Sequence, residues 1–587
     1  METESPHIAS LRDTVQVRLA DGRVFEGRRN EPLGRFLSAA HPDRNDPIIA
    51  AVVGDTLREL AWPVPTDIDA MPVYVSDSDG MRIYSRTLSF LLVVAVHEMH
   101  PGSRVFIDYS VPDGGYYCRV EGHRPFTPRE LGKIADHMRK IVAADRPIER
   151  CRMTLDEALE LFAARGEPEK AALLRDHNED HIHLYELNGF REHAYGYMAP
   201  STGILRTFAL ETFGDGFILR IPRREAPTVI QPLRRFTGLR DVFVEYGRWL
   251  QLLGIPHVGA LNEAVRDGRI RPLILVAEAL HEKRIAEIAR MVVDAHRKKS
   301  RVVLIAGPSS SGKTTFAKRL AVQILASGLH PFLLGMDDYF HPRYELARIQ
   351  GDALDFDALS ALDVELLLDH VERLLRGDKV ALPRYDFRTG LRSTRPLGRV
   401  DPDQIILAEG IHGLNPELVE RFNPRPFCIF VSALTQLNLD SHSRVPTTDT
   451  RLLRRVVRDA RERGYDAETT LGMWDDVRDG EKRNIFPFQE QADVMFNSAL
   501  AYELAVLRPL AEPLLLQVRS RLQRIEAERL LAFLKWFEGC SAEGIPANSI
   551  LREFIGGSTF EDASWVIRPA ARAESAGEDE GSERGHE

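Results

Sequence analysis

One short segment of the chain holds the residue types best suited to bind phosphate. It reads Gly307, Pro308, Ser309, Ser310, Ser311, Gly312, Lys313, Thr314 and Thr315, which satisfies the pattern G-x-x-x-x-G-K-[ST]. Glycines let backbone N–H groups turn inward onto phosphate oxygens, and a following helix adds partial positive charge at its first turn. We therefore expect this loop to hold the phosphates of ATP, with Lys313 on the β- and γ-phosphates and the Thr314 hydroxyl on Mg²⁺. The alternative is a turn that only joins a strand to a helix.

Two carboxylates follow apolar stretches further along the chain. Asp337 comes after residues 332–335, and Glu409 comes directly after residues 405–408. Ligands of open α/β folds bind at the carboxyl edge of the sheet, so both acids are expected to face the phosphate loop. There Asp337 could accept the proton of an attacking alcohol, and Glu409 could hold Mg²⁺ or its water. The alternatives are that Asp337 caps the next segment and that Glu409 is an ordinary turn acid.

Arginines are concentrated in residues 451–463, which read RLLRRVVRDARER. Phosphoryl transfer needs cations that close over the transferring group, and a helical lid of arginines would supply them. A solvated helix face explains such a run equally well. The N-K-x-D pattern that specifies guanine in GTPases is not evident in the later strand region, which argues against a GTP switch.

The elements that must position these residues follow from the apolar pattern after residue 300. Short apolar stretches alternate with helical ones, and we expect strands at 302–306, 332–335, 405–408 and 427–431 and a helix at 314–327. Strands that alternate with helices indicate a parallel sheet with crossover helices. The sequence therefore predicts an α/β P-loop domain over residues 299–510.

The remaining length predicts further units, since 587 residues correspond to about four domains. Alternation around Asp21-Gly22 predicts a hairpin at the start of a small domain, and a second alternating stretch, 71–84, precedes a helical run at 88–100. The expected divisions are a flexible start at 1–11, a small β-rich domain at 12–79, an α+β domain at 80–235, a helical connector at 236–298, a helical region at 511–568 and a disordered acidic tail at 569–587.

Composition restricts the partners of the chain. Lys and Arg total 77 against 87 Asp and Glu, a net charge of -10, which disfavours a wholesale nucleic-acid binder but permits a local basic channel. The longest apolar stretch, 88–96, is half the length of a bilayer crossing, so no membrane span is expected. The first ten residues lack the features of a secretion signal, which favours a cytoplasmic location. The four cysteines form no C-x-x-C pair, so no cysteine zinc site or disulfide framework is predicted.

Six elements, in order over about 200 residues, resemble the uridine kinase and phosphoribulokinase family. They are the phosphate loop, Met336-Asp-Asp-Tyr-Phe340, Asp355-Phe-Asp357-(x)5-Asp363, Leu382-Pro-Arg-Tyr-Asp-Phe387, Glu409-Gly-Ile411, and the arginine segment with Asp449, Arg458-Asp459 and Glu462-Arg-Gly464. The resemblance implies a P-loop kinase that uses ATP and Mg²⁺ on a nucleoside-like small molecule. It assigns the 5′-hydroxyl base to Asp337, the ribose contacts to Asp357, the base pocket to Tyr385 and Phe387, and the lid to Arg451, Arg455 and Arg463.

The chain departs from uridine kinases at a position that reads the base. The histidine that contacts the pyrimidine three residues after the Y-D-F element is replaced by Gly390. Residues 474–497 also depart from ordinary uridine kinases and match a longer subfamily of nucleoside kinases. Uridine specificity is therefore not implied, and the acceptor stays open.

The first half resembles accessory domains of threonyl-tRNA synthetase. Residues 12–79 resemble the ubiquitin-like TGS domain, and residues 80–235 resemble the synthetase's second domain through Arg86-Thr-Leu-Ser-Phe-Leu-Leu92 and Asp113-Gly-Gly-Tyr-Tyr117. In the synthetase that domain edits mischarged tRNA with H-x-x-x-H and C-x-x-x-H elements. Here Phe90 and Val94 occupy the helical positions and no C-x-x-x-H occurs, so editing is not expected. No strong ligand signature accompanies His97, His100, His177, His181 and His183, so no zinc is assigned.

Two functions of different classes follow. The first is an ATP-dependent kinase that transfers the γ-phosphate to a primary hydroxyl of a nucleoside or related sugar-bearing molecule. The second is a nucleotide-dependent regulatory or RNA-binding protein whose first half contacts tRNA weakly. The role of the first half and the question of a homo-oligomer stay open at this point.

Overall fold

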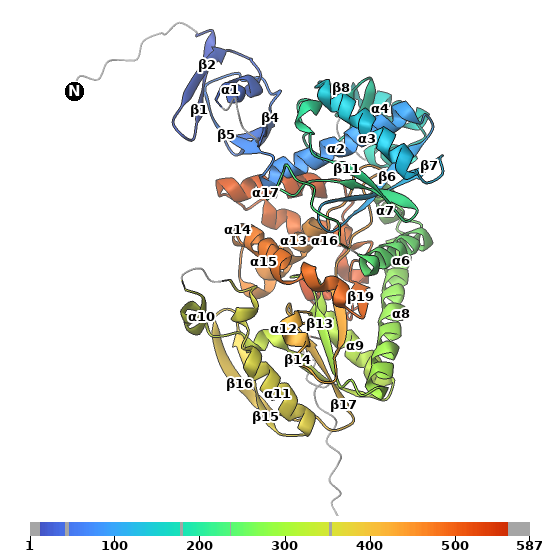
Figure 1. Ribbon diagram of the computed structural model, residues 1–587, viewed down its shortest axis with the longest axis vertical. Helices are drawn as coiled ribbons and strands as arrows, with labels where there is room; N and C mark the ends of the chain where they lie inside the picture. The colour runs from blue at the N-terminus through green and yellow to red at the C-terminus, as the bar shows by residue number, and fades with distance from the viewer. Residues whose placement is uncertain (1–11, 41–45, 176–179, 235, 352–354, 561–587) are drawn as a thin grey trace, which may run out of the picture.

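The computed structural model describes residues 12–40, 46–175, 180–234, 236–351 and 355–560 (Figure 1). The predicted flexible start at 1–11 and the predicted acidic tail at 569–587 lie outside these ranges, as do His177 and the end of the predicted helical region at 561–568. The N-terminal half occupies the top of Figure 1, and the parallel sheet of the C-terminal half lies in the lower part.

The chain begins with a five-stranded sheet in the order β2-β1-β5-β3-β4, covered by α1. Its elements are β1 Thr14–Leu19, β2 Val24–Arg28, α1 Leu33–Ala40, β3 Ile48–Val53, β4 Thr56–Glu59 and β5 Ile68–Tyr74. Arg18 pairs with Val24 across the Asp21-Gly22 turn, which confirms the predicted hairpin. β1 and β5 run parallel at the centre, and their inward side chains form a separate small core with α1.

The second predicted alternating stretch is only partly a strand. β5 ends at Tyr74, and α2 (Ser78–Met99) begins ten residues before the expected helical run at 88–100. The turn between them is made by Asp77, whose carboxylate accepts from the Tyr74 backbone N–H at 2.8 Å. Asp79 and Gly80, within the alternating stretch, therefore lie in the first turn of the helix.

An α+β unit follows, in which α2 packs among two antiparallel sheets. The sheets have the orders β11-β12-β7-β6 and β10-β9-β8, and α2 lies in their shared core. The elements are β6 Arg104–Ser110, β7 Gly115–Glu121, α3 Pro128–Ala143, β8 Glu149–Thr154, α4 Leu155–Ala164, α5 Pro168–Leu174, β9 His181–Leu187, β10 Phe190–His193, β11 Ala209–Phe213 and β12 Gly216–Arg220.

Three helices lead to the C-terminal sheet: α6 Thr237–Leu253, α7 Val258–Arg266 and α8 Ile270–Arg297. The sheet has five parallel strands in the order β14-β17-β13-β18-β19, with bounds β13 Val302–Ala306, β14 His330–Gly335, β17 Gln404–Glu409, β18 Phe427–Ser432 and β19 Val494–Asn497. The strands predicted from the apolar pattern are confirmed, and α9 (Lys313–Ala326) follows the phosphate loop as expected. β13 lies at the centre, where the chain turns to opposite sides of the sheet, which is the point where open α/β sheets bind ligands.

The remaining elements surround the carboxyl edge of this sheet. A two-stranded hairpin, β15 Val380–Asp386 and β16 Leu391–Gly398, projects from it. The helices are α10 Arg343–Gln350, α11 Val364–Arg376, α12 Pro416–Val419, α13 Thr447–Arg458, α14 Ala467–Gly472, α15 Trp474–Asn484, α16 Glu503–Leu515, α17 Arg521–Leu534 and α18 Arg552–Ile555.

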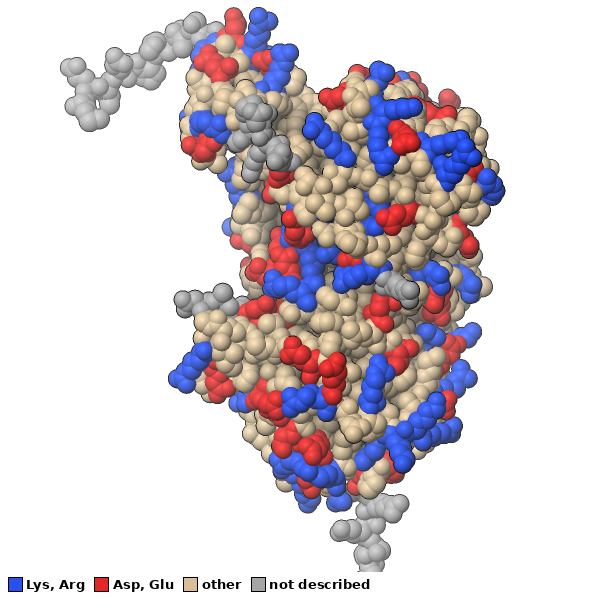
Figure 2. Space-filling model, viewed as in Figure 1, with Lys and Arg blue, Asp and Glu red and all other residues tan. Residues whose placement is uncertain are grey.

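The two halves of the molecule are joined by α17, which lies beside α2 (Figure 1). Arg82 on α2 pairs with Glu526 on α17 at 2.9 Å, and Arg521 donates to the backbone carbonyl of Gly54 at 2.9 Å. On the face drawn in Figure 2, both basic and acidic side chains gather at the level where the halves meet. In the described part of the chain, no helix is both long and apolar enough to cross a membrane.

Candidate active site

The phosphate loop has a backbone conformation that depends on glycine at its end. It connects β13 to α9, and Gly312, directly before the helix, has φ +83°, a region that residues with a side chain rarely adopt. The carbonyls of Ser310 and Ser311 face Arg454 and the Ser498 hydroxyl, so the outer side of the loop is fixed by later segments. The simple-turn alternative does not explain why this loop is so closely surrounded by charged side chains.

Lys313, Thr314 and Glu409 meet at the first turn of α9. The Thr314 hydroxyl donates to Glu409 Oε1 at 2.9 Å, and Lys313 Nζ donates to the Pro308 carbonyl at 3.1 Å. Burial raises the pKa of Glu409 to about 7, and the nearby Asp337 carboxylate adds to that rise. A hydroxyl and a carboxylate at this separation are oxygen donors of the kind that Mg²⁺ accepts, so these residues fit that cation.

The two neighbouring aspartates after β14 have different environments. Asp338 accepts from the Tyr385 backbone N–H at 3.1 Å and pairs with Arg395 at 3.1 Å, so it fixes the hairpin. The structure gives the Asp337 carboxylate no side-chain hydrogen bond within its described residues. Burial raises the Asp337 pKa, while the positive charge of Lys313 opposes the rise. Of the two aspartates, Asp338 is thus engaged by the hairpin, and Asp337 is the one that faces the charge of Lys313.

The first part of the arginine run, on α13, is buried rather than solvated. Arg451, Arg454, Arg455 and Arg458 are all at most 8% exposed on α13, and a π-helical turn, Asp459–Arg463, continues the helix. Arg451 donates to the Ser309 carbonyl at 2.9 Å, and Arg455 donates to the Ser309 hydroxyl at 2.8 Å. The helix thus brings two of the predicted lid arginines onto the phosphate loop.

Two carboxylates from distant segments occupy backbone N–H groups of the phosphate loop. Glu481 on α15 accepts from the Ser309 N–H at 2.9 Å and pairs with Arg451. Glu553 on α18 accepts from both the N–H and the hydroxyl of Thr315, at 3.0 and 2.8 Å. The Ser309 N–H belongs to the loop and the Thr315 N–H to the first turn of α9, so each carboxylate lies where an anionic oxygen is expected to bind.

A group of aromatic rings lies under the β15–β16 hairpin. The rings of Tyr385 and Phe387 are 5.1 Å apart, and Phe340 is 5.7 Å from Tyr385. Tyr385 is buried, whereas Phe387 is 40% exposed and carries the Arg463 guanidinium 5.3 Å above its ring. Burial lowers the pKa of Arg463 to about 10. This arrangement offers a partly open aromatic face of the kind that stacks on a planar ligand.

Asp357 lies on the side of α15. A Cβ on Gly480 would come within 2.5 Å of the Asp357 Cβ, so α15 contacts this residue closely. Burial raises the Asp357 pKa to about 7, with Glu481 and Asp355 adding to the rise and Arg455 opposing it. The predicted ribose-binding carboxylate is therefore brought near the lid helix.

The departure at Gly390 has a structural reason. Gly390 has φ +69° in the turn between β15 and β16, and its N–H donates to the Asp386 carbonyl at 2.7 Å. The side chain of Arg343 fills the space that a Cβ would occupy, with its Cδ at 2.5 Å from that position. Arg343 also donates to the Phe387 carbonyl at 3.0 Å. A guanidinium therefore lies where uridine kinases are expected to place a histidine.

Comparison with known proteins relates the C-terminal half to a kinase family. Residues 302–504 match the Phosphoribulokinase / Uridine kinase family. The match covers the parallel sheet, the phosphate loop, the aromatic hairpin and the arginine helix, and it supports a phosphotransferase. The acceptor is a separate question.

The N-terminal half is similar to threonine–tRNA ligases. It is 32% identical over 197 residues to the ligase of Burkholderia multivorans, and the aligned part covers 33% of this chain and 31% of that protein. It is 30% identical over 197 residues to the ligase of Paraburkholderia xenovorans. The chain thus spans about a third of the length of the curated relatives it matches.

Solved structures give weaker likenesses. A structure described as a possible uridine kinase from Bacillus stearothermophilus is 24% identical, covers 34% of this chain and 89% of its own, and has a TM-score of 0.23. The D-glycerate 3-kinase of Cryptococcus neoformans is 15% identical, covers 45% of this chain and 89% of its own, and has a TM-score of 0.21. These scores are too low to carry an argument about function.

Three residues of the site had no signal in the sequence. Arg343 could not be predicted because only the folded hairpin places it against Gly390. Glu481 could not be predicted because an acidic residue on a charged helix is common and does not indicate a contact with the loop. Glu553 lies 238 residues after its partner Thr315, so no local pattern relates the two.

Proposed function

We propose that the protein is an ATP- and Mg²⁺-dependent kinase that transfers the γ-phosphate to a primary hydroxyl of a nucleoside or related sugar-bearing small molecule. The observation that carries the proposal is the buried Asp337 carboxylate, which faces the charge of Lys313 beside a phosphate loop whose Thr314 hydroxyl and Glu409 carboxylate lie 2.9 Å apart. A phosphoryl-transfer site needs positioned cations and an acceptor for the proton of the attacking hydroxyl, and these residues supply both.

The roles divide among the residues described. The loop from Gly307 to Thr315, with Lys313, would hold the phosphates, and Thr314 with Glu409 would hold Mg²⁺. Bound Mg²⁺ would neutralise charge on the phosphate oxygens. Asp337 would orient the hydroxyl and accept its proton. The buried arginines Arg451 and Arg455 would stabilise negative charge, because fixed cations in a dry site act more strongly than in water.

The acceptor would lie between the aromatic group and Asp357. Tyr385 and Phe387 offer a stacking face, Arg463 closes over it, and Asp357 would accept hydrogen bonds from ribose or sugar hydroxyls. Arg343 beside Gly390 presents only N–H donors, so it favours an acceptor with carbonyl, ring-nitrogen or anionic oxygens at that end.

An ATP-consumption screen over nucleosides and sugar alcohols tests the activity and finds the acceptor. D337N should lower kcat by about 10²- to 10⁴-fold, the usual size of a general-base effect. D369N is the matched control, because Asp369 is exposed on α11 and pairs with Arg373, not with a residue of the site. A D337N enzyme with the wild-type rate would refute the role of Asp337, and no phosphorylation of any hydroxyl compound would refute the kinase.

A second function is supported by the likeness of the N-terminal half to threonine–tRNA ligases. On this proposal that half contacts tRNA while the phosphate loop senses nucleotide. A filter-binding titration with tRNA over a range of salt concentrations tests it, because binding through phosphates weakens steeply as salt rises. Absence of binding at low salt would refute it.

A further inference from the structure

A cavity of about 730 Å³ lies between the two halves of the molecule. Its walls come from α2 and the β6–β7 sheet on one side, and from the segment before α13, from α15 and from α17 on the other. The phosphate loop does not contribute to it, so it is distinct from the site described above. Its volume is in the range of pockets that bind small organic molecules.

Aromatic rings form a large part of the wall. Phe90, Tyr116, Tyr195, Tyr197, Phe533 and Trp536 all line the cavity. Trp536 and Tyr195 meet edge to face at 4.8 Å, and the Tyr195 hydroxyl donates to Asp440 at 2.9 Å. Such walls suit the apolar body of a ligand.

The acids of the cavity wall are already neutralised. Asp79 pairs with Arg82 at 2.8 Å, Asp449 with Arg529 at 2.7 Å, and Glu528 with Arg524. The remaining acid, Glu192, belongs to a buried cluster of charged side chains.

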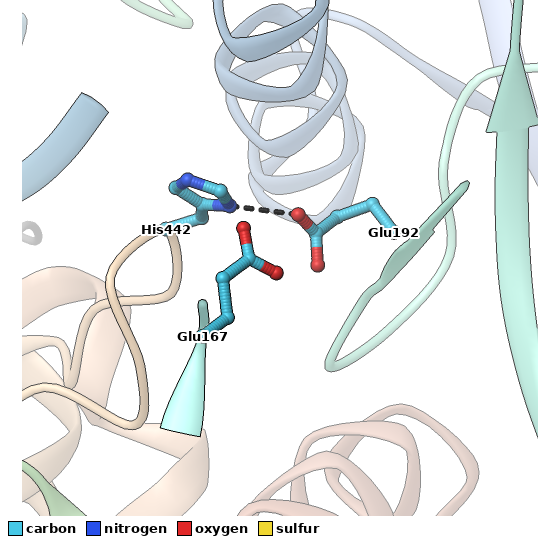
Figure 3. A group of neighbouring side chains, drawn as sticks. All are labelled: Glu167, Glu192 and His442. Carbon is cyan, nitrogen blue, oxygen red and sulfur yellow. Dashed lines mark hydrogen bonds and ion pairs between the residues drawn. The ribbon is translucent and has the colours of Figure 1, made fainter. Parts of the chain in front are cut away.

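Glu192 lies with Glu167 and His442 in the cluster drawn in Figure 3, where the three side chains point toward one another. Three such groups could hold a metal ion, but Lys170 Nζ lies 2.6 Å from Glu192, 3.3 Å from Glu167 and 2.8 Å from His442 Nδ1. The Lys170 ammonium therefore occupies the position that a metal ion would take. Glu192 is neutralised within this cluster and has no charge to offer the rest of the cavity.

Three arginines on the wall are left without a close acidic partner in the described structure. Arg86 donates to the Tyr197 carbonyl at 2.5 Å, and Arg444 donates to the Ser110 hydroxyl at 3.2 Å. Arg478 has only an ion pair with Asp475 at 4.0 Å. The buried Nε of Arg444 has no hydrogen-bond partner among the described residues. Burial lowers the pKa of all three guanidinium groups, because their charged forms lose hydration. A bound anion would offset this loss of hydration by pairing with them.

We propose that this cavity binds a phosphate-bearing organic small molecule, with its phosphate on the arginine-bearing part of the wall and its body against the aromatic rings. Planar guanidinium groups recognise phosphate through paired N–H donors, which explains three arginines rather than lysines. Arg444 and Arg478 come from the kinase half and Arg86 from the synthetase-like half, so the site exists only where the two halves meet.

The experiment is a calorimetric titration of the full chain with phenyl phosphate, with the phosphate loop first saturated with Mg²⁺ and a non-hydrolysable ATP analogue. We expect one site with a Kd below about 1 mM. R444Q and R478Q should each weaken binding by about tenfold or more, because each removes a charge-assisted contact. R444K should keep part of the affinity, which separates a lost charge from a misfolded variant. Inorganic phosphate should bind more weakly than phenyl phosphate.

R297Q is the matched control, because Arg297 is exposed on α8 and pairs with Asp294 far from the cavity wall. Absence of phenyl phosphate binding would overturn the proposal. Binding that R444Q and R478Q leave unchanged, or that R297Q weakens equally, would overturn it as well. Equal affinities for phenyl phosphate and inorganic phosphate would overturn the part that concerns an organic body.

Discussion

Glu553 should compete with ATP for the phosphate loop. Its carboxylate accepts from the Thr315 N–H at 3.0 Å and from the Thr315 hydroxyl at 2.8 Å, groups in the first turn of α9, where a helix N-terminus favours an anion. A nucleotide in the loop must displace this carboxylate. The perturbation is therefore E553A, which removes the competitor and leaves Thr315 in place.

The size of the effect follows from these two contacts. A hydrogen bond to a charged group contributes about 1.5–3 kcal/mol. The displaced carboxylate regains water, so we take the lower end, about 1.5 kcal/mol, as the net cost of moving it. Since about 1.4 kcal/mol corresponds to a factor of ten, E553A should tighten nucleotide binding roughly tenfold. E553Q keeps neutral hydrogen bonds of about half the strength and should tighten it roughly threefold.

Calorimetric titration with Mg²⁺ and a non-hydrolysable ATP analogue measures the effect. E543Q is the control, because Glu543 is exposed in the same C-terminal segment and its side chain does not reach the loop. A thermal melt of each variant checks that α18 remains docked. An E553A affinity equal to that of the wild type, or weaker, would refute the reasoning, since a carboxylate that helps the nucleotide cannot be its competitor.

Three further predictions concern the acceptor pocket, the buried core and the cavity. Because the Asp357 pKa is raised to about 7, its ionised form is gained as pH rises through 7, so the acceptor KM should fall between pH 6 and 8 in the wild type but stay flat in D357N. R454M should lower the free energy of unfolding by about 3–5 kcal/mol in urea titrations, because it leaves the buried Glu503 carboxylate, 2.7 Å from Arg454 Nε, without its partner. The double variant R454M/E503L should recover much of that loss. Phenyl phosphate in the cavity should change the affinity for the ATP analogue, and by linkage the analogue should change phenyl phosphate affinity by the same factor; a factor of one would show independent sites.

The parallel sheet and the phosphate loop were predictable because their signals are local. Each strand is a short apolar run, and the loop motif stands between such a run and a helix, as β13 and α9 show. The meeting of Thr314 and Glu409 was also predictable, since strands β13 and β17 end at the same edge. The start of α2 was not, because Asp77 sets the turn through one side-chain contact that the alternating pattern does not reveal.

What the sequence could not provide is the pairing of distant charges. From the sequence, the arginine run was consistent both with a solvent-exposed helix face and with a lid over the phosphate site, because the periodicity of a helix does not show which elements pack against it. The structure covers it with the phosphate loop, Glu481 and Glu503. The cavity was equally hidden, since Arg86 is more than 350 residues from Arg444 and Arg478 in the chain and only the docking of the two halves brings them to one cavity.

Helix α13 connects the cavity, the phosphate loop and the aromatic group of the hairpin. Thr447 and Thr448 at the start of α13 line the cavity, Arg451 and Arg455 contact the phosphate loop, and the π-helical turn at its end places Arg463 over Phe387. Twelve residues at 1.5 Å each make a rod of about 18 Å, which is short enough to move as a unit. The apolar side of α13 is fully buried in the core. If ligand binding in the cavity displaces the start of α13, the phosphate loop at the other end must move with the helix, unless the packed core prevents the displacement. Coupling between the sites therefore requires no long pathway, only two positions of this helix.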